Sequence, residues 1–124
     1  MKRLFALLTL ACTFAVAPAH AQEPYPSRPL KIVVPFPPGG AADTFARLIG
    51  QKLAEAWGQA VVIENKPGAG GQIATQAVAT APADGHTLLV VTVGHAVNPS
   101  LYTRLPYDTE KDLAPVARLA TVPS

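Results

Sequence analysis

Two short segments rich in glycine and proline contain the residues that could bind a negatively charged molecule. Residues 36–40 read Phe-Pro-Pro-Gly-Gly and residues 67–71 read Pro-Gly-Ala-Gly-Gly. Each precedes a segment with helical periodicity, where the first backbone amides lack partners and the helix dipole is positive. Glycines let a ligand approach these amides closely, and prolines reduce the entropy lost on binding. The pattern predicts anion binding by main-chain N–H groups, although either loop taken alone is equally well explained as a steric turn.

The histidines and serines do not indicate catalysis or a metal site. His86 and His95 lie in segments typical of turns, and neither has a carboxylate or cysteine at metal-ligand spacing. None of the serines stands in the Gly-x-Ser-x-Gly context of a hydrolase nucleophile. We therefore predict no metal site and no catalytic residue. His95 is the better candidate for a ligand contact, and a solvated loop histidine is the alternative.

Apolar, β-branched runs alternate with helix-patterned segments after residue 29, as in α/β proteins. Strands are expected at Leu30–Phe36, Val61–Ile63 and Thr87–Val93, and helices at Ala41–Trp57, ended by Gly58, and Gln72–Ala81. The first helix has apolar residues at three- and four-residue spacing, which predicts its buried face. These residues are Phe45, Leu48, Ile49, Leu53 and Trp57. The alternation predicts an α/β fold with a parallel, doubly wound sheet.

The segments that follow parallel strands meet at one edge of the sheet, where ligands bind in such folds. The first glycine loop (residues 36–40), the second glycine loop (residues 67–71) and the segment around Thr92–His95 are therefore expected to converge. Two anion-binding loops at one edge favour a ligand site over two unrelated turns.

The pattern is less regular after residue 93. We expect a loop over Gly94–Arg104 with a turn at Asn98–Pro99, a short helix within Tyr107–Leu113, and the start of a further strand at Val116–Ala120. Because the chain stops on an apolar stretch, we interpret it as a fragment.

Residues 1–21 predict a cleavable signal peptide. A basic start precedes the apolar run Leu4–Val16, which is too short to span a bilayer, and Ala19-His20-Ala21 supplies the small-x-small cleavage pattern before Gln22. Cys12 lacks the preceding leucine of a lipoprotein signal. The sequence thus predicts export to the periplasm.

The charge pattern excludes two classes of partner. The formal charge is +2, from ten Lys/Arg and eight Asp/Glu, and Lys2 and Arg3 belong to the predicted leader. Residues 22–124 therefore balance eight basic against eight acidic side chains, 10 − 2 = 8. Without a basic stripe or a charge run, we predict no nucleic-acid binding and no direct membrane insertion of the mature chain.

Two other functions compete with solute binding. The stretch from Gly68 resembles the dinucleotide motif G-x-G-x-x-G, but Ile73 stands where glycine or alanine is required. An NAD(P)-dependent oxidoreductase of Rossmann type is therefore a weak alternative. A periplasmic sensor input that reports ligand occupancy to a signalling partner is a third.

Three segments, YPSRPLKIVVPFPPGGAADTFARLIGQKL, VVIENKPGAGGQIATQAVATAPADGHTLLV and NPSLYTRLPYDTEKDLAPVARLA, resemble the Bug family. Its members are the periplasmic receptors of tripartite tricarboxylate transporters, and the resemblance covers Tyr25–Pro123. It implies a two-lobed, periplasmic-binding-protein-like fold, with residues 22–124 as an incomplete first lobe. It further implies that the protein is no enzyme and needs no cofactor. By the same resemblance, it captures a small carboxylate and delivers it to the transporter's membrane subunits.

The resemblance also implies which residues hold the ligand. In the family, main-chain amides and ordered water at the two glycine-rich loops bind the carboxylate, and the third segment can add a contact. Carried onto this chain, the ligand-binding residues are Phe36, Pro38, Gly39, Gly40, Asp43, Gly68, Ala69, Gly70, Thr92 and His95. For Asp43 two interpretations stay open: a carboxylate favoured by the helix dipole, or one that orders water near the ligand.

Overall fold

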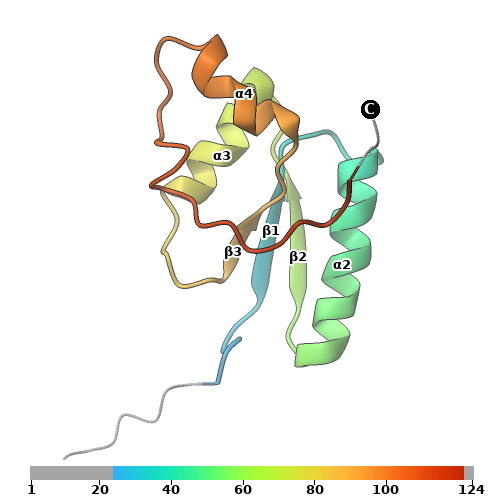
Figure 1. Ribbon diagram of the computed structural model, residues 1–124. Helices are drawn as coiled ribbons and strands as arrows, with labels where there is room; N and C mark the ends of the chain where they lie inside the picture. The colour runs from blue at the N-terminus through green and yellow to red at the C-terminus, as the bar shows by residue number, and fades with distance from the viewer. Residues whose placement is uncertain (1–23, 122–124) are drawn as a thin grey trace, which may run out of the picture.

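The computed structural model describes residues 24–121 (Figure 1). The predicted signal peptide and its cleavage site therefore lie outside the described residues. The elements are β1 (Leu30–Val34), α2 (Ala41–Trp57), β2 (Val61–Asn65), the short 3₁₀ helix η2 (Ala69–Gly71), α3 (Gln72–Ala79), β3 (Thr87–Leu89) and α4 (Val93–Leu101).

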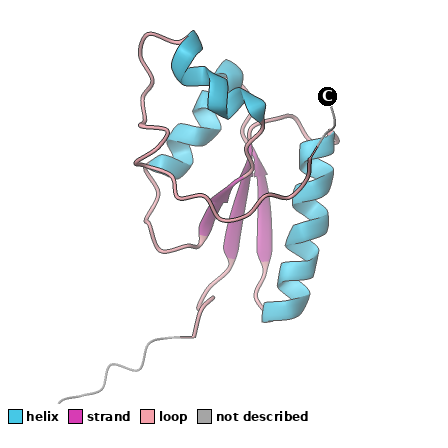
Figure 2. Cartoon of the chain, in the orientation of Figure 1, coloured by secondary structure: helices cyan, strands magenta, loops and turns pink. Residues whose placement is uncertain are grey.

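The three strands form one parallel sheet in the order β2-β1-β3. Ile32 of β1 is in register with Ile63 on one side and Leu88 on the other. Helix α2 packs on β2 and β1, and α3 packs on β3 and β1 from the other side of the sheet, so helices flank it on both sides (Figures 1 and 2). The predicted doubly wound α/β fold is confirmed.

The centre of the sheet forms the core, as the apolar run of β1 predicts. Leu30, Val33 and Val34 are almost fully buried. Ile32 and Val34 pack with Ala46 of α2, and partly buried residues from the neighbouring strands surround them. A central parallel strand covered on both faces needs apolar side chains at nearly every position.

The buried face of α2 differs from the prediction. Phe45, Leu48 and Trp57 are substantially exposed, whereas Ala46 and Gly50 are buried. A Cβ on Gly50 would lie 3.1 Å from Cγ1 of Val61 and from Cδ1 of Ile63. Small residues therefore face the sheet because the helix runs close to it. Of the predicted stripe, Leu53 does pack against the core.

Helix α4 replaces most of the loop expected over Gly94–Arg104, so that prediction is wrong. Asn98–Pro99 is normally a turn signal, because the residue before a proline is disfavoured in a helix. Here the Asn98 side chain is buried and donates a hydrogen bond to the Gly70 carbonyl. The backbone carbonyl of Asn98 accepts the Tyr102 N–H at 3.0 Å. A tertiary contact thus overrides the local preference.

The ends of several strands and helices also differ from the prediction. The first strand stops at Val34, the third at Leu89 and helix α3 at Ala79, while β2 extends to Asn65. The predicted ends Phe36 and Ala81 lie outside regular elements, and Val93 is the first residue of α4.

The expected helix within Tyr107–Leu113 is only one turn, closed by the Asp112 N–H on the Asp108 carbonyl at 3.0 Å. The Asp108 side chain accepts the N–H groups of Glu110 and Lys111, as an N-cap residue does, yet the segment makes only this single turn. The expected strand at Val116–Ala120 is also wrong, because this stretch pairs with no strand among residues 24–121. Within the same residues, no helix is both long and apolar enough to cross a bilayer.

Candidate functional site

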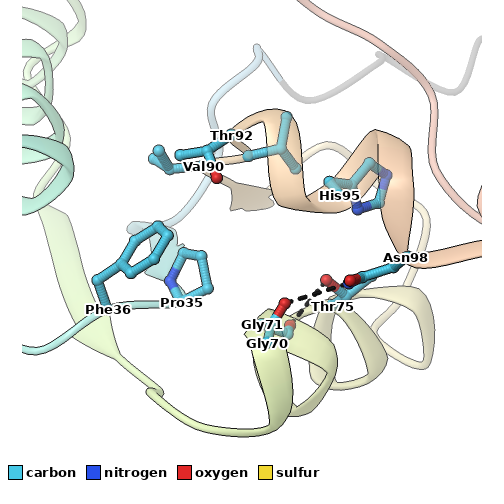
Figure 3. Close-up of a pocket in the computed structure, with 10 residues that line it drawn as sticks. Pro35, Phe36, Gly70, Gly71, Thr75, Val90, Thr92, His95 and Asn98 are labelled. Atoms are coloured by element: carbon cyan, nitrogen blue, oxygen red, sulfur yellow. Dashed lines mark hydrogen bonds between the residues drawn. The ribbon is translucent and has the colours of Figure 1, made fainter. Parts of the chain in front are cut away.

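The segments after all three strands meet at the carboxyl edge of the sheet, as expected. They surround a cavity of about 20 Å³, which is enough for roughly one water molecule. Figure 3 shows its lining. The lining residues are Pro35, Phe36, Gly70, Gly71, Thr75, Val90, Val91, Thr92, His95 and Asn98.

Four of the ten candidate site residues line this cavity: Phe36, Gly70, Thr92 and His95. Five others lie exposed in the glycine loops, outside the cavity lining. These are Pro38, Gly39, Gly40, Gly68 and Ala69. The tenth, Asp43, is only 2% exposed and lies in the first turn of α2. The structure therefore gathers one group around a cavity and leaves the rest along the adjoining loops.

The second glycine loop turns sharply through four consecutive residues with positive φ, from Gly68 to Gly71. Ala69 is the one residue among them with a side chain, at φ +47°. The Gly71 N–H bonds the Gly68 carbonyl at 2.9 Å. The N–H groups of Ala69 and Gly70 have no hydrogen-bond partner within residues 24–121. Such turns make concavities of backbone donors that suit an anion.

Two buried side chains, both of which also line the cavity, bind this loop. Asn98 of α4 donates from Nδ2 to the Gly70 carbonyl at 3.1 Å, and the Thr75 hydroxyl donates to the Gly71 carbonyl at 2.9 Å (Figure 3). Both residues are nearly fully buried. Because these two carbonyls are bonded, the Gly70 and Gly71 peptide groups are held in one orientation.

The sequence reasoning missed six residues of the lining: Pro35, Gly71, Thr75, Val90, Val91 and Asn98. Proximity to the strand ends could have indicated Pro35 and Val90. Asn98 carried only a turn signal, and its contact with Gly70 bridges 28 residues, so no local pattern predicts it.

His95 lies on α4 and is half-buried, so the alternative of a solvated loop histidine is wrong. Its ring is stacked on Tyr107, with ring centroids 6.3 Å apart and planes 7° apart. Burial lowers the pKa of His95, and its Nδ1 atom is buried without a partner among the described residues. A neutral imidazole in this position can donate or accept one hydrogen bond at the cavity.

Asp43 accepts three hydrogen bonds, each 2.9 Å long: from the Arg47 Nε, from the Gly39 backbone N–H and from the Asn65 Nδ2. The Arg47 bond is the largest of the causes that hold the Asp43 pKa far below its ordinary range, followed by the Gly39 and Asn65 bonds. The helix dipole alone does not account for this carboxylate. Because Gly39 donates to it, the Gly39 N–H is already occupied.

Among residues 24–121, no group of three or more His, Cys, Asp or Glu is arranged to hold a metal ion. The site consists of backbone donors, the hydroxyls of Thr75 and Thr92, the Asn98 amide, the His95 imidazole and apolar walls. Such a set fits the recognition of a small anion by hydrogen bonds.

A family model described as tripartite tricarboxylate transporter family receptor matches residues 45–124. The chain belongs to this family. It is a family of receptors and not of enzymes, which argues against the oxidoreductase alternative.

Individual relatives agree with the assignment. The chain is 46% identical over 123 residues to the UPF0065 protein in the tcbD-tcbE intergenic region of Pseudomonas sp. (strain P51). That match covers 99% of this chain and 37% of the relative, so the chain spans little more than a third of the relative's length.

Two solved structures show the same fold. MatC from Rhodopseudomonas palustris, with bound malate, is 46% identical, with a TM-score of 0.72 over 77% of this chain and 33% of that one. The periplasmic binding protein BugD is 42% identical, with a TM-score of 0.67 over 71% of this chain and 29% of that one. The resemblance to the Bug family and the predicted periplasmic-binding-protein type of fold are confirmed.

Proposed function

We propose that residues 22–124 form part of the first lobe of a periplasmic receptor that captures a small carboxylate for the membrane subunits of a tripartite tricarboxylate transporter. The observation that carries this proposal is the convergence of three strand-end segments on one cavity, beside unpaired backbone donors. Family membership and a malate-bound structural neighbour support it.

The backbone would bind the carboxylate. The N–H groups of Ala69 and Gly70 have no partner within residues 24–121, nor does that of Gly40, which begins α2 without a side-chain cap. Hydrogen bonds from such donors to a carboxylate are charge-assisted, and therefore stronger than neutral ones. The positive ends of α2 and α3 add to the attraction.

Side chains at the cavity would contact the rest of the ligand. The Thr92 hydroxyl and the neutral His95 imidazole can each bond a polar group, and Phe36 supplies an apolar wall. We retain the exposed glycine-loop residues Pro38, Gly39, Gly68 and Ala69 as the rim of the site.

This chain offers only part of the site. The cavity holds about one water molecule, which is too little for a whole dicarboxylate. A full-length receptor, meaning this chain followed by the remaining segment of such a protein, should therefore bind strongly. The 124-residue chain by itself should bind the same ligand weakly or not at all.

Calorimetry on the full-length receptor tests the proposal with malate, succinate, longer dicarboxylates and NAD as ligands. We expect saturable binding of at least one carboxylate and none of NAD. Binding of NAD without any carboxylate would reject the receptor function. Transport in cells with and without the membrane subunits then separates delivery to a transporter from a sensor role.

We also propose that residues 1–21 direct export and are removed before Gln22. Mass spectrometry of periplasmic extract should find a mature N-terminus at or near Gln22. An intact Met1, or a lipid on Cys12, would contradict this.

A further inference from the structure

Two side chains from different elements meet beneath the first glycine loop. Asp43 belongs to the first turn of α2 and Asn65 is the last residue of β2. The Asn65 Nδ2 donates to the Asp43 Oδ1 at 2.9 Å. This contact joins the helix that follows the loop to the strand beside it.

Each of the two side chains also binds the loop itself, at a different backbone atom. The Gly39 N–H donates to the Asp43 Oδ2 at 2.9 Å, and the Asn65 Nδ2 donates to the Phe36 carbonyl at 3.0 Å. Asp43 supplies only acceptors here, and Asn65 supplies the donor that the carbonyl needs. The loop is thus held near both of its ends by groups of opposite hydrogen-bonding character.

Arg47 completes the cluster. Its Nε donates to the Asp43 Oδ2 at 2.9 Å and its terminal nitrogen donates to the Asn65 Oδ1 at 3.3 Å. Both hydrogens and the oxygen of the Asn65 amide are therefore used. Asn65 therefore has no donor left for a carboxylate ligand, and the Asp43 carboxylate offers only acceptors.

We propose that Asp43 and Asn65 are positioning residues: they fix the first glycine loop so that Phe36 and Gly40 stand ready for the ligand's carboxylate. This inference rests on the proposed function. Phe36 lines the cavity and the Gly40 N–H has no partner within residues 24–121. A loop already held in its binding conformation loses less entropy when the ligand arrives.

Two variants of the full-length receptor test the proposal, Asp43→Asn and Asn65→Ala. An asparagine at 43 retains one acceptor and places an NH₂ group against existing donors. Alanine at 65 removes the donor to the Phe36 carbonyl and leaves the Asp43–Gly39 bond in place. We expect each variant to bind carboxylate at least about tenfold more weakly. Should one variant not fold, the other decides.

A second readout separates positioning from general stability. Pro37 and Pro38 carry no amide proton, so the readout in this loop is the Gly39 N–H, which donates to Asp43. Its hydrogen exchange in the ligand-free protein should be faster in both variants, directly in Asp43→Asn and through the loosened loop in Asn65→Ala, and exchange in β1 and β3 should be unchanged. Asp84→Asn is the matched control, because Asp84 also accepts a backbone N–H and an arginine but lies before β3, at the opposite edge of the sheet. It should leave both affinity and loop exchange as they are.

Affinity within about twofold of wild type in a folded variant, or unchanged exchange at the Gly39 N–H, would overturn the proposal. If the wild-type receptor binds no carboxylate, the proposed function fails instead. The exchange measurement needs no ligand, so it still decides whether Asp43 and Asn65 hold the loop.

Discussion

The side-chain amide of Asn98 donates a hydrogen bond to the backbone carbonyl of Gly70, with 3.1 Å between Nδ2 and the oxygen. It ties α4 to the loop that begins α3, across 28 residues of sequence. Asn98 is 4% exposed, so water does not easily replace this bond. The contact explains both why α4 continues through Pro99 and why the second glycine loop faces the cavity as it does.

Asn98→Ala should therefore destabilise the protein by about 0.5–1.5 kcal/mol, because it removes a part-buried hydrogen bond to the Gly70 carbonyl. Asn98→Asp should be worse, since it puts an acceptor against that carbonyl. Urea unfolding of the three proteins measures the difference. Equal stability of wild type and Asn98→Ala would mean that the bond contributes nothing.

Gly70→Ala tests the backbone of the second glycine loop. Gly70 has a φ of +61°, and a Cβ there would lie 3.2 Å from the Tyr102 hydroxyl oxygen. We expect a loss of about 1–2 kcal/mol from the left-handed conformation alone. Carboxylate affinity should fall as well, because the Gly70 N–H shifts.

Two control variants separate the effect of backbone strain at Gly70 from the effect of the contact with Tyr102. Adding Tyr102→Phe to Gly70→Ala removes the hydroxyl oxygen that the new Cβ would crowd. The double variant should regain only the part of the lost stability that is due to this contact. Gly40→Ala should be well tolerated for folding, since Gly40 has an extended backbone and its Cβ would come no nearer than 3.9 Å to the Pro37 carbonyl. Calorimetry and unfolding on the same samples check both statements. A Gly70→Ala protein as stable as wild type would contradict the assigned loop conformation.

His95 should make stability depend on pH near neutrality. Burial lowers its pKa from the ordinary 6.5, so the folded protein favours the neutral ring. As the pH drops below 6.5, the unfolded chain takes up a proton that the folded protein resists, and stability is lost until the lower folded pKa is passed. His95→Phe keeps a ring against Tyr107 and cannot titrate.

Melting curves of wild type and His95→Phe between about pH 5 and pH 8 check this. The stability of wild type relative to the variant should decrease toward acid. Parallel curves would show that burial of His95 does not disfavour its charged form.

Asp43 should govern stability in a more acidic range. Its folded-state pKa is depressed, chiefly by the Arg47 bond, so its contribution is present above the ordinary value of 3.8 and is lost as the pH falls below it. Wild type should therefore lose stability below about pH 4, while Asp43→Asn changes less over the same range.

Asp84 and Asp108 also have lowered pKa values, but they remain in both proteins, so the difference between the two curves isolates Asp43. Urea unfolding at a series of acidic pH values measures it. A constant difference between wild type and Asp43→Asn would contradict the ion pair and its hydrogen bonds.

Local patterns determined much of the fold. The apolar run of β1, the helical spacing of residues 41–57 and the order of strands and helices sufficed to predict a parallel doubly wound sheet, and with it the edge where the loops meet. The two glycine loops were identified for the same reason, since their glycines and prolines restrict or free the backbone locally. The resemblance to a receptor family rested on contiguous motifs, which a sequence carries in full.

Only the tertiary structure decided which residues of those loops line a cavity and which of their backbone groups are bonded to side chains. Asn98 became helical, His95 became half-buried beside Tyr107, and the Gly39 N–H was taken by Asp43. Each outcome depends on a partner outside the local segment, or on which of several possible donors pairs with an acceptor in the folded protein. Periodicity and turn preference describe the chain one segment at a time, whereas burial and hydrogen-bond pairing are set where distant segments touch.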